Sequence, residues 1–301
     1  MHIVSSTERI TMTIIDSQVH VWEAESPGRA WPDESAKFRH GPPAVTAEWV
    51  LQEMELNGVA GAILVPPSFE GDRNDTVRSA AQRYPNRFVA MGRVALDAED
   101  AQDRVRSLAS DPFFVGLRVT FNARASKWLK DGTIDWLWPL AEEIDLAVSV
   151  FPPGQTKEIA KIASAHPDLR LSIDHLALGL DIRDEMILPE IAQLCDLARF
   201  DNVAVKASCL PSYVTEAYPY PYPVLGAVLQ RVVDAFGARR VFWGSDLTRL
   251  GCKYSEAISY VSSVTPQLGY DDVRLIMGDA IRDWFRIASF AKEPPHPTAG
   301  V

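Results

Sequence analysis

The stretch FFVGLRVTF, residues 113–121, alternates as a strand that lines a closed barrel is expected to alternate. Val115, Leu117 and Val119 fall on one face, and Arg118 and Thr120 fall on the other, because successive side chains of a strand point to opposite sides. The apolar face suits packing beneath helices, and the polar face suits a barrel interior. The stretch therefore predicts a barrel strand with Arg118 directed inward.

A second stretch, NVAVKAS at residues 202–208, has the same pattern. Val203 and Val205 lie on one face and oppose Ala204, Lys206 and Ser208 on the other. Lys206 is therefore predicted to point inward too. Active sites of such barrels lie at the carboxyl ends of the strands, where both basic residues fall.

Short β-rich runs alternate with helical runs through most of the chain, which is the pattern of a parallel sheet. Eight such units predict an α/β fold of the (β/α)8 TIM-barrel type, in a single domain over residues 13–290. An open doubly wound sheet is the alternative, but no GxGxxG or Walker A motif favours it. Residues 1–12 are predicted to be a disordered extension, and the Pro-rich residues 291–301 a loose tail. The β-rich runs span residues 13–22, 59–67, 87–96, 113–121, 146–153, 169–178, 202–208 and 240–247.

One helix, over residues 46–58, carries clear end signals. Thr46 is a candidate N-cap, and Asn57 with Gly58 forms a candidate C-terminal stop. Val50 and Met54 are four residues apart, so they share the face that is expected to pack on the sheet.

The composition excludes some classes of binding partner. The 301 residues carry a net charge of −10, which argues against nucleic acid or an anionic membrane because both require clustered Lys and Arg. A small-molecule substrate is the better expectation, and a homo-oligomer stays open. The three cysteines are too far apart for a CxxC pair and predict free thiols in a reducing cytoplasm. No signal peptide or 18-residue apolar span is present in the sequence.

Five motifs in barrel order together resemble a known family. They are DSQVHVW (16–22), GLRVTF (116–121), SIDHLAL (172–178), NVAVKAS (202–208) and FWGSDL (242–247). The chain resembles the amidohydrolase superfamily over residues 14–285. Within that superfamily it is similar to the amidohydrolase-related branch, which includes 2-pyrone-4,6-dicarboxylate lactonases, sugar lactonases and metal-dependent decarboxylases.

The resemblance implies a site in which His-x-His follows strand one, further histidines follow strands five and six, and an aspartate follows strand eight. His20, His175 and Asp246 match that pattern, whereas Gln18 replaces the first histidine and strand five has none. A carboxamide is a weak zinc ligand, so neither a bound metal nor another cofactor is expected. Three ligands and a water can still form a catalytic zinc site, which keeps the metal-dependent alternative open.

Without a metal, the similar lactonases imply hydrolysis by the same side chains. Asp246 would activate water as general base, and His20 and His175 would stabilise the oxyanion. Gln18 would orient His20 or donate to the substrate carbonyl. Because an alkoxide leaves more readily than an amide nitrogen, a lactone or cyclic ester is expected before an amide. The alternatives are a metal-dependent decarboxylase or amide hydrolase, and a barrel that only binds a small molecule.

Arg118 is the best candidate for holding a substrate carboxylate, because a guanidinium forms paired hydrogen bonds with it. The structural alternatives are an internal ion pair for Arg118, a salt bridge for Lys206 and a helix N-cap for Asp246. Asp174 is expected to brace a loop, and His40 to be an ordinary loop histidine. Further candidates for an anionic pocket or its rim are Trp22, Ser68, Asn74, Arg124, Lys206 and Arg249.

Overall fold

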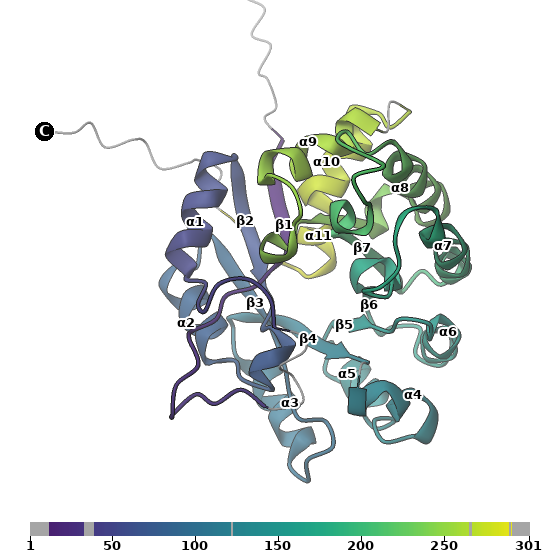
Figure 1. Ribbon diagram of the computed structural model, residues 1–301. Helices are drawn as coiled ribbons and strands as arrows, with labels where there is room; N and C mark the ends of the chain where they lie inside the picture. The colour runs from purple at the N-terminus through teal and green to yellow at the C-terminus, as the bar shows by residue number, and fades with distance from the viewer. Residues whose placement is uncertain (1–11, 33–38, 122, 265–266, 289, 291–301) are drawn as a thin grey trace, which may run out of the picture.

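The computed structural model describes residues 12–32, 39–121, 123–264, 267–288 and 290. Its eight strands are parallel and follow one another around a barrel in sequence order, as Figure 1 shows. The predicted single-domain (β/α)8 barrel is therefore confirmed. The strands are β1 (Ile14–Val19), β2 (Val59–Leu64), β3 (Phe88–Gly92), β4 (Phe114–Thr120), β5 (Val148–Phe151), β6 (Leu171–Ile173), β7 (Val203–Ser208) and β8 (Val241–Gly244).

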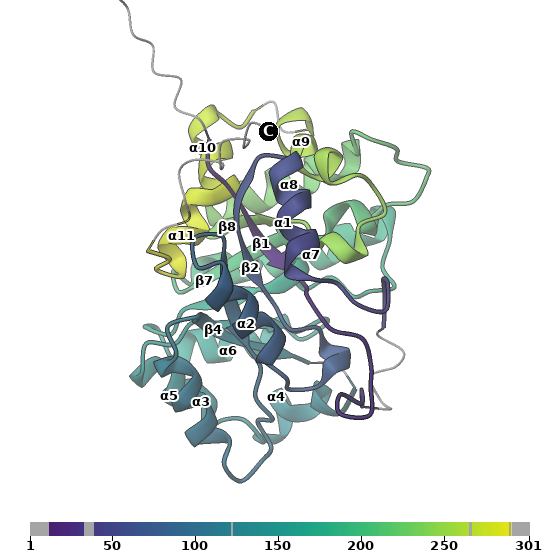
Figure 2. The same cartoon turned by 90° about the vertical axis from the view of Figure 1, so that its left-hand side faces the viewer.

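Helices lie outside the strands, and α1 and α2 cover the outer side of β1 and β2 (Figure 2). Helices α9, α10 and α11 gather near β1, on the side where the end of the chain meets its beginning (Figure 1). The helices are α1 (Ala47–Leu56), α2 (Asp75–Arg83), α3 (Ala101–Ser110), α4 (Trp128–Asp131), α5 (Leu137–Glu143), α6 (Thr156–Ala165), α7 (Ile187–Cys195), α8 (Pro223–Phe236), α9 (Tyr254–Val264), α10 (Tyr270–Arg274) and α11 (Ala280–Trp284).

The predicted ends of the first helix are confirmed. The hydroxyl of Thr46 accepts a hydrogen bond from the backbone N–H of Trp49, which satisfies one of the free donors of α1. At the other end Asn57 is the C-cap, and Gly58 adopts a φ of 69°. A residue without Cβ accepts that left-handed conformation at little cost, so the chain turns there toward β2.

Apolar side chains fill one part of the barrel. Ile63, Met91 and Phe242 come from three strands and pack in one cluster with Phe285, which follows α11. The Lys206 ammonium lies 5.9 Å from the centre of the Phe285 ring. Polar side chains therefore begin at the level of Lys206 and continue toward the carboxyl ends of the strands.

No helix of the described residues is both long and apolar enough to cross a membrane. Apart from Met12, the predicted extension at 1–12 and the predicted tail at 291–301 lie outside the described residues.

Candidate active site

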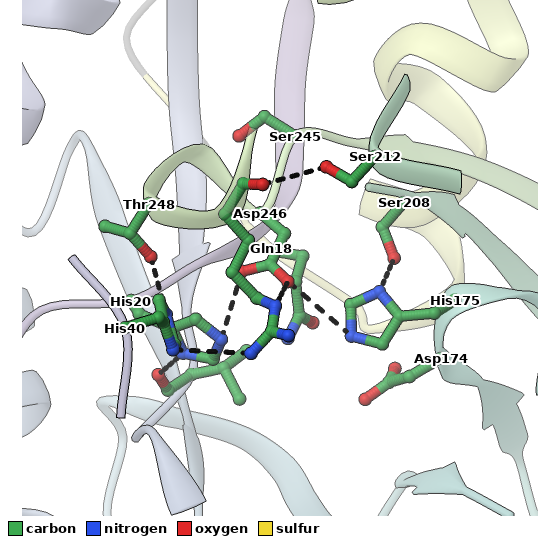
Figure 3. A network of polar contacts seen from close by, with 12 residues as sticks. Gln18, His20, His40, Asp174, His175, Ser208, Ser212, Ser245, Asp246 and Thr248 are labelled. Carbon is green, nitrogen blue, oxygen red and sulfur yellow. Dashed lines mark hydrogen bonds and ion pairs between the residues drawn. The ribbon is translucent and has the colours of Figure 1, made fainter. Parts of the chain in front are cut away.

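Three predicted side chains converge at the carboxyl end of the barrel (Figure 3). His20 directly follows β1, His175 follows β6 and Asp246 lies two residues after β8. Nε2 of His20 is 3.2 Å from Oδ1 of Asp246, and Nε2 of His175 is 3.9 Å from Oδ2 of the same carboxylate. One carboxylate thus faces two imidazoles.

The backbone after β6 explains why two adjacent residues both face the barrel interior. His175, Leu176 and Ala177 all have a positive φ, between 52° and 58°, and form a tight turn with Asp174 (residues 174–177). Strict alternation would send Asp174 and His175 to opposite faces. The left-handed turn removes that alternation, so the prediction that Asp174 braces a loop was wrong.

Hydrogen bonds fix which ring atoms of the histidines face the carboxylate. Nδ1 of His20 lies 2.6 Å from the carbonyl oxygen of Val65, which only accepts, so Nδ1 carries a proton. Nδ1 of His175 is 2.9 Å from the hydroxyl of Ser208. Both Nε2 atoms are therefore left to face Asp246.

The charge of the site follows from these contacts. Burial disfavours the charged form of Asp246, but His20 and His175 outweigh burial and hold the pKa of that carboxyl well below its usual range. Oδ1 of Asp246 therefore lies 3.2 Å from an imidazole nitrogen that is free to hold or give up a proton beside an ionised carboxylate. Burial lowers the pKa of His175 to about 4, so this second imidazole is neutral near pH 7.

A buried charge network lies below these residues. Asp174 accepts a hydrogen bond from Nε of Arg118 at 3.0 Å and lies 3.1 Å from Nζ of Lys206. Burial alone would raise the pKa of Asp174, but Lys206 and Arg118 hold it below its usual range. Nζ of Lys206 also donates to Oε1 of Gln18 at 3.2 Å. A lysine only donates, so the oxygen of Gln18 must face it, and Nε2 of Gln18 is buried without a hydrogen-bond partner among the described residues.

The pocket above this network has a cavity volume of about 50 Å³ and opens to solvent. Arg118, Ser68 and Arg249 lie in its wall with His20, His175 and Asp246. Nε of Arg249 is 3.9 Å from Asp246. Its remaining wall is formed by His40, Pro67, Thr120, Phe151 and Leu180.

Several other candidates lie away from this wall. Gln18 and Lys206 are fully buried beneath it, and Trp22 packs in the core at 1% exposure. Asn74 pairs with the backbone of Arg93 through both its amide atoms. As the structure stands, these four residues do not offer a polar group to a ligand in the pocket. The side chain of Arg124 lies outside the described residues.

His40 is a pocket residue that the sequence did not indicate. Its Nδ1 lies 3.3 Å from Nη1 of Arg249, and its Nε2 lies 3.0 Å from the hydroxyl of Thr248. Its ring also contacts those of His20 and Phe69 at centroid distances of 5.9 and 5.5 Å. His40 comes from the connection between β1 and α1, where neither spacing nor periodicity marks the residues that fold over the barrel.

The side chain of Asp246 does not cap the helical turn that follows it, which was the structural alternative for this residue. Asp246 precedes a short 3-10 turn (Leu247–Arg249), but its carboxylate makes no capping hydrogen bond to that turn. The carboxylate is instead directed at the two imidazoles (Figure 3).

The donor set does not fit a divalent metal ion well. The carboxamide oxygen at the first ligand position is taken up by Lys206, and β5 ends in Phe151, which lies in the pocket wall and is not a metal ligand. Across the described part of the chain, no group of three or more His, Cys, Asp or Glu residues is arranged to hold a metal ion. The cationic Arg249 beside Asp246 would also repel a metal cation.

Comparison with known proteins supports what the geometry indicates. The family model described as amidohydrolase matches residues 15–287. An L-fucono-1,5-lactonase of Burkholderia ambifaria is 28% identical over 239 residues, which cover 77% of this chain and 79% of the relative.

Two solved structures have the same fold. A Burkholderia multivorans amidohydrolase with bound zinc has a TM-score of 0.75 at 18% identity, and the match covers 91% of this chain and 99% of the other. A probable 2-pyrone-4,6-dicarboxylic acid hydrolase of Acinetobacter baumannii, with citric acid bound, has a TM-score of 0.71 at 18% identity. That match covers 91% of this chain and 100% of the other.

The fold and site are those of a barrel hydrolase. The chain belongs to the amidohydrolase family, and it is an enzyme of the hydrolase class.

Proposed function

We propose that the protein opens a lactone or related cyclic ester that carries a carboxylate, and that it does so without a metal ion. The observation that carries the proposal is the position of the Asp246 carboxylate between two imidazoles, with Nε2 of His20 at 3.2 Å from one oxygen and Nε2 of His175 at 3.9 Å from the other. The relation to an L-fucono-1,5-lactonase supports ester chemistry on this barrel.

The nucleophilic water would lie between Asp246 and His175. Oδ2 of Asp246 and Nε2 of His175 are 3.9 Å apart, so one water can reach both at hydrogen-bond distance. Asp246 orients that water and takes its proton as the water oxygen bonds to the lactone carbonyl carbon. Because its pKa is lowered, Asp246 is ionised throughout the neutral range and ready to accept.

Nε2 of His20 stabilises the tetrahedral intermediate. As Asp246 takes up the water proton, an Nε2–H group of His20 turns from that carboxylate to the developing oxyanion, in a buried site where such a hydrogen bond is strong. When the intermediate collapses, the ring C–O bond breaks and the alkoxide takes the proton held by Asp246. Water and lactone thereby give one hydroxy acid.

Arg118 and Arg249 determine the preference for an anionic substrate. Nε of Arg118 is held by Asp174, and its Nη groups make no hydrogen bond to another described residue, which leaves them for a carboxylate at the pocket wall. Gln18 would act from below, by accepting the hydrogen bond that holds Lys206.

The test combines metal analysis with a substrate screen. Purified protein would be assayed for metal content and for hydrolysis of 2-pyrone-4,6-dicarboxylate and of neutral sugar lactones, with and without EDTA. Hydrolysis that resists EDTA at less than about a tenth of an equivalent of metal supports the proposal. Activity that needs a full equivalent of metal would overturn it in favour of a metal-dependent hydrolase or decarboxylase.

The variant Asp246→Asn distinguishes an enzyme from a binding protein. It retains the size of the side chain but cannot accept the water proton, so kcat should fall by about 10²- to 10⁴-fold while binding of the substrate persists. Wild-type protein that binds these lactones without turning any of them over would contradict the proposed hydrolysis.

A further inference from the structure

Asp16 is a buried carboxylate that the proposed reaction does not use. It lies on β1 at 0% exposure, yet it accepts four hydrogen bonds. Oδ1 accepts from the backbone N–H groups of Gln18 at 3.1 Å and Ser245 at 2.8 Å. Oδ2 accepts from the hydroxyls of Ser245 at 2.5 Å and Tyr254 at 2.8 Å. Tyr254 begins α9, so one carboxylate joins β1, the end of β8 and a helix of the outer layer.

These contacts lie where the barrel closes. Within the described residues, each strand from β1 to β7 is hydrogen-bonded to the strand that follows it. Strands β8 and β1 are not joined by a ladder of backbone hydrogen bonds. They are connected instead by the backbone N–H of Asp246, which donates to the carbonyl of Gln18 at 2.8 Å, and by the carboxylate of Asp16 on Ser245. The junction of the two strands is thus fixed at the residue before Asp246.

The backbone of Asp246 needs such support. Its φ and ψ are both 51°, in the left-handed region that a residue with a side chain adopts only when its surroundings hold it there. That conformation directs the carboxylate to His20 and His175. A rotation of the preceding peptide would move the carboxylate away from both imidazoles.

We propose that Asp16 is a positioning residue for Asp246: it clamps Ser245 and thereby sets the direction of the Asp246 carboxylate. This inference rests on the proposed hydrolysis for its effect on rate. A carboxylate suits the position because four donors converge on it and both of its oxygens accept. An asparagine would place an NH2 group against at least one of those donors.

The variants Asp16→Asn and Tyr254→Phe test this role as a matched pair. Tyr254→Phe removes one of the four hydrogen bonds and leaves the clamp on Ser245, so it controls for general loosening beneath α9. We expect Asp16→Asn to lower kcat by about 100-fold or more, because a misplacement near 1 Å can cost that much. Its KM should stay within about threefold of wild type, since Asp16 is remote from the pocket wall. Tyr254→Phe should keep kcat within about threefold of wild type, whatever it loses in melting temperature.

The pH profile separates positioning from simple destabilisation. The acid limb of kcat should change most in Asp16→Asn, because the contact of Asp246 with His20 changes and a group whose pKa burial raises to about 6 is removed. Tyr254→Phe removes only one of the hydrogen bonds that lower the pKa of Asp16, so it should move the acid limb slightly to higher pH. If Asp16→Asn fails to fold, Ser245→Ala serves instead; it removes one clamp hydrogen bond and should lower kcat by about tenfold. Equal losses of kcat in the Asp16 and Tyr254 variants, with unmoved pH profiles, would overturn the proposal.

A readout without substrate keeps the two proposals distinguishable. In histidine-labelled protein, the imidazole resonances of His20 report its contact with Asp246 directly. They should shift in Asp16→Asn and remain near the wild-type positions in Tyr254→Phe. If the wild type hydrolyses no lactone, the proposed function fails, while these resonances still decide whether Asp16 positions Asp246.

Discussion

Replacing Lys206 by methionine should destabilise the protein without changing the affinity for substrate. Lys206 is completely buried, lies 3.1 Å from Asp174 and donates to Gln18. At that separation and an effective dielectric constant near 20, the attraction of the two charges is about 5 kcal/mol. Methionine fills similar space but leaves Asp174 with only Arg118, so we expect a net loss of about 3 kcal/mol in unfolding free energy.

Urea unfolding followed by tryptophan fluorescence measures this loss. The control is Lys157→Met, because Lys157 is exposed on α6 and its replacement should change the unfolding free energy by less than about 0.5 kcal/mol. KM for an active lactone should stay within about twofold of wild type in both variants. If Lys206→Met kept wild-type stability and raised KM tenfold, Lys206 would be a substrate ligand and our interpretation of the buried network would be wrong.

Three further predictions concern substrate charge, acid stability and packing. Arg118→Lys keeps a cation near Asp174 but loses the two Nη groups. KM for a carboxylate-bearing lactone should therefore rise by about tenfold, while KM for a neutral lactone stays constant. An equal change in KM for both substrates would argue against carboxylate binding by Arg118. The folded-state pKa of His175, about 4, is below the ordinary 6.5, so its contribution to stability is present above pH 6.5 and is lost as the pH falls toward 4. Urea unfolding would measure the difference in unfolding free energy between wild type and His175→Asn at pH 7 and at pH 4. This difference should be smaller at pH 4 by up to about 3 kcal/mol, and an equal difference at both pH values would contradict the reasoning. At Gly278, an added Cβ would come within 2.1 Å of the carbonyl oxygen of Thr13, so Gly278→Ala should lower the unfolding free energy by about 1 to 3 kcal/mol. Gly28→Ala, which meets nothing within 4 Å, is the control, and a comparable loss there would show that packing against Thr13 is not the cause.

The fold could be predicted because its signals are local and repeated. Each strand has its own apolar face, and a helix such as α1 carries its own cap at Thr46 and its own stop at Gly58. His20 and Asp246 were indicated by the resemblance to the amidohydrolase superfamily, and they lie at the carboxyl ends of the first and the last strand. Alternation also placed Arg118 in the barrel interior.

The rest of the site depends on geometry that departs from regular structure. Asp174 was misplaced because three successive left-handed residues after β6 cancel the alternation on which the prediction relied. His40 was missed because tertiary packing alone brings the β1–α1 connection to the pocket. Lys206 was correctly predicted to point inward. The alternation of a strand does not show how far below the pocket an inward side chain lies, and this depth decides whether its charge contacts a ligand or a buried partner.

The turn at His175, Leu176 and Ala177 places activity and stability in opposition. Each of these residues has a side chain in a backbone conformation that costs about 1 to 2 kcal/mol, a cost that glycine largely avoids. A search for more heat-stable variants should therefore favour glycine at Ala177, whereas at Leu176 the loss of a fully buried side chain would outweigh the gain. Glycine at Ala177 would widen the range of angles open to the turn, and His175 would lose part of its fixed orientation toward Asp246. Improved resistance to heat at this turn should consequently come with slower turnover.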